Sequence, residues 1–276
     1  TPGGQFSTNA ESLAALKEKL PFVGPILEYR DGFKIQSTYV RPFLELSRVD
    51  GKVHTDYVQT GTATGRLSSR EPNMQNIPQE SVWAKELRSA FVPAPSFLFL
   101  AFDYSQIELR VMAALSEDPE MTAAFEKGLD IHQATAAKVF DVPLDRVAPP
   151  MRRLAKTLNF GLIYGMGVTA FAKTSGLSRE RAGAFIKTYF SEFRNVREWQ
   201  ERVKRDVRTF GYVETKTGRR RYLPGIASGS PRAVSESERA AVNHPIQGLA
   251  ADIIKLAMVR VREDLARRGW WNDSVR

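Results

Sequence analysis

The sequence predicts a mixed α+β fold in which helices dominate the second half. Apolar residues recur every three or four positions in five stretches, as they do in helices with one buried face. These stretches are residues 106–115, 121–140, 151–166, 178–209 and 232–267. The β part rests on two patterns. A continuous apolar run at residues 97–102 is typical of a buried strand, and the segments around Lys216-Thr217-Gly218 have the pattern of a small hairpin.

The first hundred residues give weaker signals. Residues 7–30 begin with Ser, Thr and Asn, which cap helices, and continue with leucines at helical spacing, so we expect a short helix before Pro21. Residues 51–82 are rich in Gly, Thr, Ser, Asn and Pro and are expected to form loops. Further on, Pro149-Pro150 suits the first turn of a helix.

Composition narrows the classes of function. The 276 residues include 40 Lys and Arg against 31 Asp and Glu, a net charge of +9 that favours a polyanionic partner such as nucleic acid. A merely basic soluble protein remains the alternative. The chain has no cysteine, which excludes disulfides, thiolate catalysis and Cys-based zinc sites. The chain has three histidines, too few to favour a His-rich metal site. Among metal sites, those that bind a metal such as Mg²⁺ through oxygen ligands remain possible.

The sequence also carries expectations about location and extent. No apolar run approaches the roughly 20 residues that span a membrane. The start, Thr1-Pro2-Gly3-Gly4, has neither an initiator Met nor a signal-peptide core. We therefore expect a soluble cytoplasmic protein, and we expect the chain to be an internal fragment.

The first segment with chemical potential runs from Asp103 to Arg110. It places a carboxylate at the end of the expected strand and a second one, Glu108, where the chain has turned into a helix. An Asp at such an edge can offer a divalent ion one carboxylate oxygen and one backbone carbonyl oxygen. The alternative, for an isolated Asp, is a helix N-cap.

The second segment runs from Arg152 to Gly165. Arg152, Lys156, Phe160 and Tyr164 are each four residues apart, so on a helix they form one stripe about 18 Å long. Two cations can clamp a triphosphate, and two rings can stack on a base. The alternative is a solvated basic end that runs into an aromatic end facing the core.

Together these segments resemble motifs A and B of the family A DNA polymerases, in the same order. Further segments with the family's pattern are Thr64-Gly65-Arg66-Leu67-Ser68-Ser69, Pro72-Asn73-Met74-Gln75-Asn76-Ile77-Pro78, Asp130-Ile131-His132, Gly211-Tyr212-Val213-Glu214-Thr215 and Gln247-Gly248-Leu249-Ala250-Ala251-Asp252. The resemblance spans essentially the whole chain. It implies a truncated right-hand polymerase architecture, an antiparallel palm sheet with a mostly helical fingers domain inserted. Residues 1–115 would form the base of the thumb and the first part of the palm, 116–228 the fingers, and 229–276 the second part of the palm.

The resemblance also implies an activity: addition of dNTPs to a primer 3′-hydroxyl by two-metal nucleotidyl transfer, with release of pyrophosphate. Asp103 and the Tyr104 carbonyl would hold Mg²⁺, with two ions in the complete enzyme. Arg152, Lys156 and His132 would hold the phosphates, and Lys156 is a candidate proton donor to pyrophosphate. Without the resemblance, His132 is better explained as a core or helix-start histidine.

The remaining implied roles concern the sugar, the base and the duplex. Gln106 lies in the nucleotide site, Glu108 matches the gate that rejects a 2′-hydroxyl, and Phe160 packs on the incoming sugar and base. Tyr164 would stack at the template position. Residues that would touch the duplex near the primer terminus are Arg66, Asn73, Gln75 and Gln247. Their alternatives are ordinary loop or helix-cap roles. Primer-template DNA and dNTPs are the implied partners of a monomer acting in replication or repair.

One part of the family pattern is absent. The third catalytic motif, His-Asp-Glu, does not occur in these 276 residues, and neither Asp252 nor Glu108 is a persuasive substitute for its Asp. We therefore expect this chain by itself to be weak or inactive. A catalytically inactive nucleic-acid-binding module is the alternative from another class. A single-subunit RNA polymerase is the alternative among enzymes, and Glu108 and Phe160 argue against it.

Overall fold

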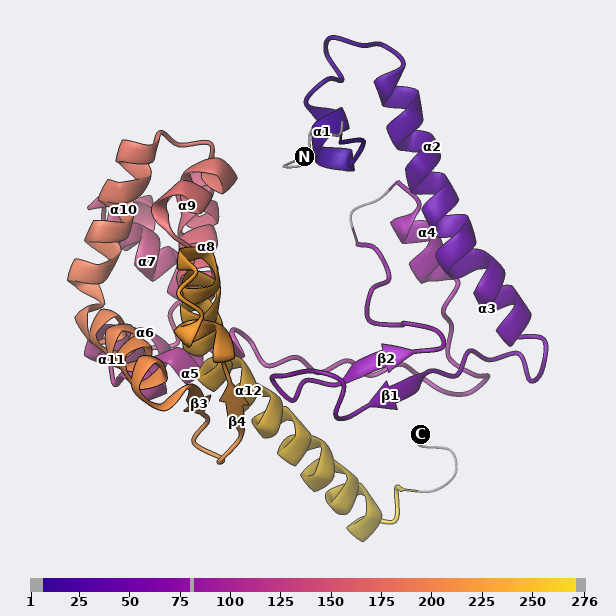
Figure 1. The fold of residues 1–276 in the computed structure, drawn as a ribbon. Coiled ribbons are helices and arrows are strands. Elements are labelled where there is room, and N and C mark those ends of the chain that lie inside the picture. The colour runs from indigo at the N-terminus through magenta and orange to yellow at the C-terminus, as the bar shows by residue number, and fades with distance from the viewer. Residues whose placement is uncertain (1–6, 80–81, 272–276) are drawn as a thin grey trace. The chain divides into compact units, whose positions relative to one another are not determined.

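The chain folds as two compact units in the computed structural model, which describes residues 7–79 and 82–271 (Figure 1). Unit 1 comprises residues 1–61 and 67–102, and unit 2 comprises residues 62–66 and 103–276. Helices dominate both units, and the strands form two small antiparallel sheets. The predicted α+β class is therefore confirmed. In the described ranges, every helix is too short or too polar to cross a membrane.

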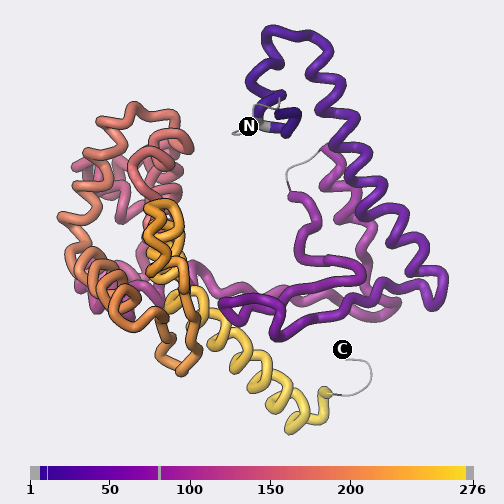
Figure 2. Tube along the Cα trace, in the orientation of Figure 1, coloured from indigo at the N-terminus to yellow at the C-terminus, as the bar shows by residue number. Residues whose placement is uncertain are grey.

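Unit 1 is built around one long helical segment. Its elements are α1 (Ala10–Ala14), α2 (Val23–Ile35), the π-helical turn η1 (Gln36–Val40), α3 (Arg41–Leu46), β1 (Asp56–Val58), β2 (Ser68–Arg70) and α4 (Ala84–Ser89). The trace in Figure 2 runs without a break from α2 through η1 into α3. The short helix expected before Pro21 is present as α1. The α2–α3 segment and the β1–β2 ladder were not predicted.

A small core holds unit 1 together. Ile35, Tyr39 and Phe43 lie on one side of the long helical segment and pack with Leu87 of α4. The Phe43 ring meets the edge of Phe91 at 5.5 Å between centroids. The spacing of four residues places these side chains on one helix face, which explains why this face is buried while its opposite side is solvated.

The predicted buried strand at residues 97–102 is wrong. This segment has irregular backbone, and its apolar side chains are exposed, with Leu98 at 84% and Phe102 at 91% of full exposure. A strand needs a neighbour to pair its backbone N–H and C=O groups. Among the described residues, the two sheets are β1–β2 and β3–β4, and neither includes this run.

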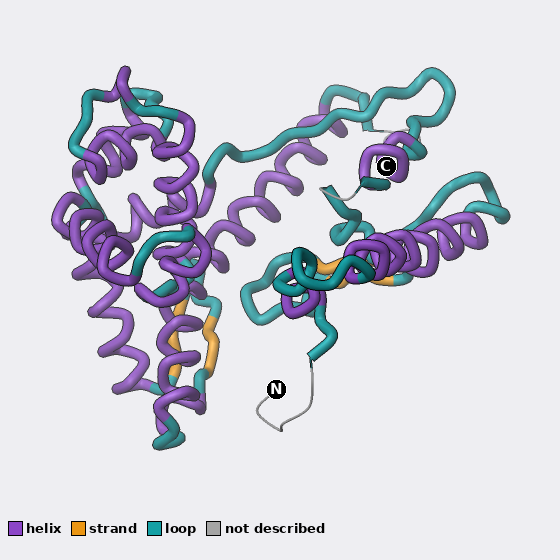
Figure 3. Tube along the Cα trace, turned by 90° about the horizontal axis from the view of Figure 1, so that it is seen from above, coloured by secondary structure: helices purple, strands orange, loops and turns teal. Residues whose placement is uncertain are grey.

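Unit 2 is mainly helical, as the purple segments of Figure 3 show. Its elements are α5 (Ile107–Ser116), α6 (Pro119–Glu126), α7 (Ile131–Phe140), η2 (Leu144–Arg146), α8 (Pro149–Ile163), α9 (Val168–Ser175), α10 (Arg179–Glu192), α11 (Arg194–Phe210), β3 (Tyr212–Glu214), β4 (Arg220–Tyr222), η3 (Pro224–Ala227) and α12 (Pro231–Arg267). All five predicted helical stretches are present, and the hairpin is confirmed with Tyr212 opposite Tyr222.

Two of those stretches are each divided into two helices. The first is interrupted between α6 and α7, where Gly128 adopts φ +65°, a conformation that glycine tolerates best. The second is interrupted at Phe193, which lies between α10 and α11 with φ −106° and ψ 66°. Phe193 is 1% exposed, and its ring packs at a tilt of 52° against Tyr189, so burial of the ring stabilises the bend.

The core of unit 2 gathers the faces of α5, α7, α8, α11 and α12. Leu109, Ile131, Leu158 and Ile246 are each buried to 1% exposure or less. Side-chain caps fix where several helices begin: Asp118 caps α6, Asp130 caps α7, Ser178 caps α10 and Ser230 caps α12. These helices position the residues of the candidate site.

Candidate functional site

Helix α8 presents the predicted stripe. The helix begins with Pro149 and Pro150, and it buries Ala155, Leu158, Leu162 and Ile163 against the core. Arg152 and Phe160 are half-buried, whereas Lys156 and Tyr164 are exposed. The stripe lies beside the buried face, so burial of the apolar residues leaves it accessible at the edge of unit 2.

Arg152 is held at the start of α7. Its Nε lies 3.0 Å and its Nη2 2.5 Å from Oδ2 of Asp130. The other carboxylate oxygen accepts hydrogen bonds from the backbone N–H groups of His132, at 2.9 Å, and Gln133, at 3.0 Å. Burial raises the pKa of Asp130, but the hydrogen bond from Arg152 and the backbone N–H groups outweigh it and lower the pKa. Asp130 thus stays ionised and orients the guanidinium.

His132 belongs to the first turn of α7, and its ring packs against α8 and is 3% exposed. Its ring centroid is 5.5 Å from that of Phe160. Burial lowers the pKa of His132; Arg152 and Lys156 lower it further, while Asp130 opposes them. The imidazole is therefore neutral near pH 7. His132 and Phe160, two of the predicted nucleotide-binding residues, are therefore neighbours. They lie close to the Arg152–Asp130 ion pair.

A second cluster joins Arg66, Glu108 and Tyr164. Glu108, in the first turn of α5, is 6% exposed and forms a salt bridge with Arg66. The Tyr164 hydroxyl donates a hydrogen bond to Oε2 of Glu108 at 2.7 Å. Burial together with this carboxylate raises the pKa of Tyr164 to about 12. Tyr164 is thus a neutral donor at pH 7, and it ties the C-terminal end of α8 to the start of α5.

Gln106 sets the direction in which α5 starts. It occupies the N-cap position with φ 51° and ψ 38°, a left-handed conformation that is uncommon for residues other than glycine. Its carbonyl accepts from the N–H groups of Leu109 and Arg110, both at 3.0 Å. The sharp turn ends the extended segment at Ser105 and directs Glu108 into the interior, where it reaches Arg66.

Asp103 and Tyr104 lie just before this turn and are exposed. In the described ranges the Asp103 carboxylate has no hydrogen bond or ion pair, and no group of three or more His, Cys, Asp or Glu side chains is placed to hold a metal ion. Carboxylate and carbonyl oxygens are ligands that suit one Mg²⁺ held partly by substrate phosphates. Asp103 and Tyr104 therefore fit such an ion.

Neither Glu108 nor Asp252, the two carboxylates weighed as a second metal ligand, is free to act as one. Glu108 is engaged by Arg66 and Tyr164. Asp252, on α12, accepts from Arg219 Nη2 at 2.6 Å and from Thr217. Burial raises the pKa of Asp252, but the hydrogen bonds from Arg219 and Thr217 outweigh it and lower the pKa, so this carboxylate is part of a structural ion pair.

The other predicted residues, Gln247, Asn73 and Gln75, take no part in the hydrogen bonds and ion pairs of these two clusters. Gln247 is half-buried on α12. Asn73 and Gln75 belong to unit 1, where Oδ1 of Asn73 accepts from the Gln75 N–H at 3.1 Å and stabilises the loop after β2. This is the ordinary loop role weighed as their alternative; their contact with DNA stays a prediction.

Sequence reasoning missed three polar residues that organise the site. Asp130 and Asn159 lie inside segments with the family pattern but were given no role, and Thr135 was not considered. Asn159 and Thr135 are both 0% exposed and hydrogen-bond to each other, and Asn159 also hydrogen-bonds to His132. Polar residues at buried helix positions were the available signal, but burial depends on which helices pack together.

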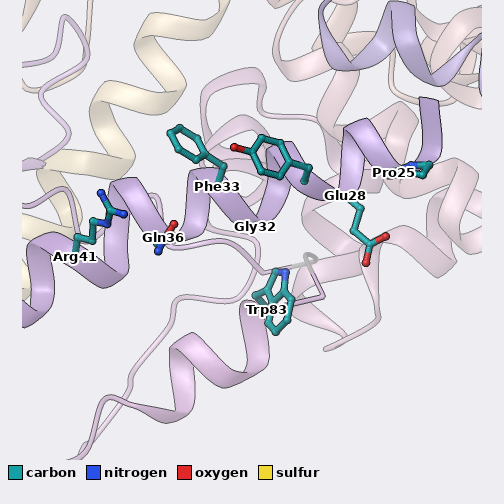
Figure 4. Close-up of a pocket in the computed structure, with 8 residues that line it drawn as sticks. Pro25, Glu28, Gly32, Phe33, Gln36, Arg41 and Trp83 are labelled. Carbon is teal, nitrogen blue, oxygen red and sulfur yellow. The ribbon is translucent and has the colours of Figure 1, made fainter. Parts of the chain in front are cut away.

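Two cavities lie elsewhere in the molecule. One cavity, of about 660 Å³, lies in unit 1 and is lined by Trp83 and by residues of α2. Figure 4 shows the Trp83 ring below α2, near Gly32, whereas the Phe33 ring points to the opposite side of the helix. A second one, of about 680 Å³, lies on α10 and α11 and is lined by several arginines. Neither includes a predicted site residue, so the candidate site rests on the two side-chain clusters of unit 2.

Comparison with known proteins gives a consistent family. The family model described as DNA polymerase family A matches residues 1–274. DNA polymerase I, thermostable, of Thermus aquaticus is 46% identical over 267 residues, which are 96% of this chain and 32% of that protein. DNA polymerase I of Geobacillus stearothermophilus is 46% identical over 265 residues, covering 94% of this chain and 30% of that protein. The chain thus spans about a third of the length of these relatives.

A solved structure is similar in fold as well as in sequence. It is the POL domain of Pol1 from M. smegmatis in complex with DNA primer-template and dNTP, with a TM-score of 0.87 and 40% identity. The alignment covers 98% of this chain and 49% of that one. The similarity therefore extends over both units and includes the segments that carry the candidate site.

Proposed function

The chain belongs to DNA polymerase family A, and we propose that it supplies the nucleotide-binding face of a DNA-templated DNA polymerase. The reaction joins the primer 3′-hydroxyl oxygen to the α-phosphorus of a dNTP, and the bond from that phosphorus to the β-phosphate oxygen breaks to release pyrophosphate. Primer-template DNA and dNTPs are the proposed partners of a monomeric, cytoplasmic enzyme of replication or repair. That the M. smegmatis structure holds a primer-template and a dNTP supports these substrates.

We keep the proposed division of the chain into a thumb base and first palm part at 1–115, fingers at 116–228 and a second palm part at 229–276. In this frame α8 is the fingers helix that faces the substrate. Residues 103–115, α8 and α12 all belong to unit 2, which supports their joint action in one site.

The observation that carries the proposal is the arrangement on α8. Arg152, oriented by Asp130, and Lys156, exposed one turn further on, are two cations spaced to meet successive phosphates of one triphosphate. His132 and Phe160 adjoin the same stripe. A dNTP would place its phosphates on the cations and its sugar and base against Phe160. Lys156 would also donate a proton to the leaving pyrophosphate.

Glu108 and Tyr164 would shape the floor of the site. The salt bridge to Arg66 and the hydrogen bond from Tyr164 hold the Glu108 side chain in one place. A fixed side chain under the nucleotide sugar rejects a 2′-hydroxyl by volume, which favours dNTPs over NTPs. Tyr164 would meet the template base. Arg66, Asn73, Gln75 and Gln247 would contact the duplex, where the minor-groove acceptors allow shape checking without sequence readout.

We propose Mg²⁺ as the cofactor, held by the Asp103 carboxylate and the Tyr104 carbonyl together with substrate phosphates. When bound, such an ion lowers the pKa of the attacking hydroxyl and stabilises charge on the phosphates. A complete two-ion site needs a second carboxylate beside Asp103. Since Glu108 and Asp252 are engaged elsewhere, we propose that this chain by itself is a weak or inactive catalyst.

Primer extension tests the proposal. The purified chain is given a labelled primer-template, Mg²⁺ and all four dNTPs, beside the Asp103→Ala variant, and binding of the same DNA is measured in both. We expect salt-dependent DNA binding by both forms and little extension by either. Extension that disappears in Asp103→Ala would support the polymerase and overturn the weak-catalyst part. A folded chain that binds neither DNA nor dNTP would contradict the proposed function.

One outcome would favour the alternative function. Salt-dependent binding of primer-template with no effect of any dNTP on that binding would indicate a nucleic-acid-binding module without a nucleotide site. The net charge of +9 makes DNA binding alone an insufficient criterion, because any strongly basic surface attracts phosphate. The nucleotide dependence of binding therefore separates the two functions.

A further inference from the structure

A closed network of polar groups lies behind the candidate site. Thr135 and Asn159 are each 0% exposed and His132 is 3% exposed. The Asn159 amide nitrogen Nδ2 lies 3.1 Å from Nδ1 of His132 and 3.0 Å from Oγ1 of Thr135. The side chains of Thr135 and Asn159 are fully buried and cannot bond to water, so the hydrogen bonds within the network decide where their protons are.

The donor and acceptor roles in the network follow from the Thr135 hydroxyl. Its hydroxyl lies 2.8 Å from the carbonyl of Ile131 one turn earlier on α7, and 3.2 Å from Oδ1 of Asn159. A hydroxyl has one proton, and the shorter contact takes it. Oγ1 of Thr135 is then an acceptor toward Asn159. The Asn159 amide group has two protons, so one goes to Thr135 and the other is directed at Nδ1 of His132.

This direction fixes the protonation of His132. A ring nitrogen that accepts a hydrogen bond carries no proton, and a neutral imidazole then carries its single proton on the other nitrogen, Nε2. Nε2 has no protein partner in the described part of the chain and is not among the buried polar atoms that lack one, so it keeps access to solvent. It is a free N–H donor next to Phe160 and near the Arg152–Asp130 pair.

The tautomer matters for a phosphate ligand. Phosphate oxygens accept hydrogen bonds, so a ring that presents Nε2–H attracts them, whereas a ring that presents the Nε2 lone pair repels them. Because His132 is buried and neutral, it cannot rely on charge as Arg152 and Lys156 do. Its contribution depends on which nitrogen holds the proton.

We propose that Asn159, held by Thr135, is a positioning residue that keeps His132 in the Nε2–H form, so that His132 donates to a phosphate oxygen of the nucleotide. The proposal rests on the proposed function, in which His132 meets the triphosphate. Asn159 itself touches no substrate. It acts through His132, in the way that groups behind a histidine commonly set its tautomer.

The first test is spectroscopic and needs no nucleotide. Two-dimensional ¹⁵N–¹H spectra of the histidine rings distinguish a protonated ring nitrogen from a bare one. The chain has three histidines, so the spectrum of His132→Gln identifies the signals of His132 by their loss. At pH 7.5 we expect the proton on Nε2 and a bare Nδ1. A proton on Nδ1 would mean that the Asn159 oxygen faces the ring, and this would overturn the proposal.

The second test measures the consequence for binding. A complementary dNTP is titrated into the chain bound to a primer-template whose primer lacks a 3′-hydroxyl. Asn159→Leu removes the bond to Nδ1, and Thr135→Val removes only the hydroxyl that holds Asn159. We expect Asn159→Leu to weaken binding roughly tenfold, the equivalent of one lost hydrogen bond, and Thr135→Val to weaken it less. Both variants should alter the His132 ring signals.

Thr157→Val is the matched control. Thr157 also bonds to the carbonyl one turn earlier, that of Arg153 on α8, at 3.1 Å, but it makes no bond to Asn159. This variant should leave the His132 signals and the dNTP affinity unchanged. Unchanged affinity in folded Asn159→Leu and Thr135→Val would overturn the positioning role. Failure of the wild-type chain to bind dNTP, with the Nε2–H form present, would contradict the proposed function instead.

Discussion

At the residue scale, the site consists of groups whose charge states are set by their neighbours. Asp130 is kept ionised by Arg152, and His132 is kept neutral by burial. Tyr164 is kept protonated by burial and by Glu108. Each of these residues is therefore committed to one role near pH 7: the first orients a cation, and the other two present neutral donors.

The first concerns Glu108→Gln. Burial is the largest cause of the raised pKa of Tyr164, followed by the hydrogen bond to Glu108 and then by the negative charge of Glu108. Removing that charge should bring the pKa of Tyr164 from about 12 part of the way toward its ordinary value near 10. Absorbance titration measures this, with the curve of Tyr164→Phe subtracted to isolate one phenol among eight. An unchanged Tyr164 titration would show that Glu108 does not affect the pKa of this hydroxyl.

The second prediction concerns the ring at position 160. In the family, members with Phe at this position reject 3′-deoxy chain terminators better than those with Tyr. We expect Phe160→Tyr to increase incorporation of dideoxynucleotides relative to dNTPs, measured as the ratio of terminated to extended primers in an active form of the enzyme. Phe160→Leu is a control that removes the ring without adding a hydroxyl. Equal terminator use by the Phe and Tyr forms would contradict the assigned contact.

The third prediction is a pH dependence of stability. Burial lowers the pKa of His132 and of His244 in the folded state, so between those values and about 6.5 the unfolded chain binds more protons than the folded chain. Stability should therefore be highest above about pH 7 and should fall as the pH drops through this window. Urea unfolding measures it. The double variant His132→Gln, His244→Gln should lose most of this dependence, whereas His54→Gln, at an exposed position, should retain it.

At the element scale, hydrogen bonds at helix starts fix the positions of helices relative to one another within unit 2. Asp118 is 1% exposed and accepts two backbone N–H groups, from Met121 in α6 at 3.0 Å and from Asn195 in α11 at 3.2 Å. The Asn195 side chain returns a bond to the Glu117 carbonyl at 3.0 Å. One carboxylate thus caps one helix and fastens the first turn of another that is about 75 residues further along the chain.

We therefore expect Asp118→Ala to lower the free energy of unfolding by more than the loss of an ordinary helix cap does. A single cap is worth about 1 kcal/mol, and the loss here also leaves the half-buried N–H of Asn195 without a partner, so the total should be about 2–3 kcal/mol. Ser178→Ala, which removes only the α10 cap, should cost about 1 kcal/mol. Urea unfolding of both variants compares the two. Equal losses would show that the bond to Asn195 adds nothing.

Elements were predictable where the signal is local. All five predicted helical stretches are present because helix periodicity depends on neighbours within one or two turns. The strand at residues 97–102 was wrong because pairing depends on a distant partner, and the apolar run alone cannot show one. The α2–α3 segment was missed because its exposed side carries Tyr29, Phe33 and Leu44 in addition to its buried face, which obscures the amphipathic pattern.

At the scale of the whole molecule, the chain contains two units and covers about a third of its full-length relatives. The sequence predicted the α8 stripe and the helix that follows Asp103, because spacing alone places such residues, whereas the strand expected before Asp103 is absent. It did not predict the Arg152–Asp130 pair, the Glu108–Tyr164 bond or the Asn159–His132 bond. These contacts join residues 22, 56 and 27 positions apart, so they depend on how helices pack.

The central claim is that the α8 face of this chain binds a nucleotide chosen by a template. Titration of each of the four dNTPs into the chain bound to a primer-template with a 3′-dideoxy primer tests this without any need for catalysis. We expect the complementary dNTP to bind at least tenfold more tightly than the other three, a difference of ~1.4 kcal/mol, and Lys156→Ala to abolish tight binding. Equal affinity for all four dNTPs, unaffected by Lys156→Ala, would contradict it.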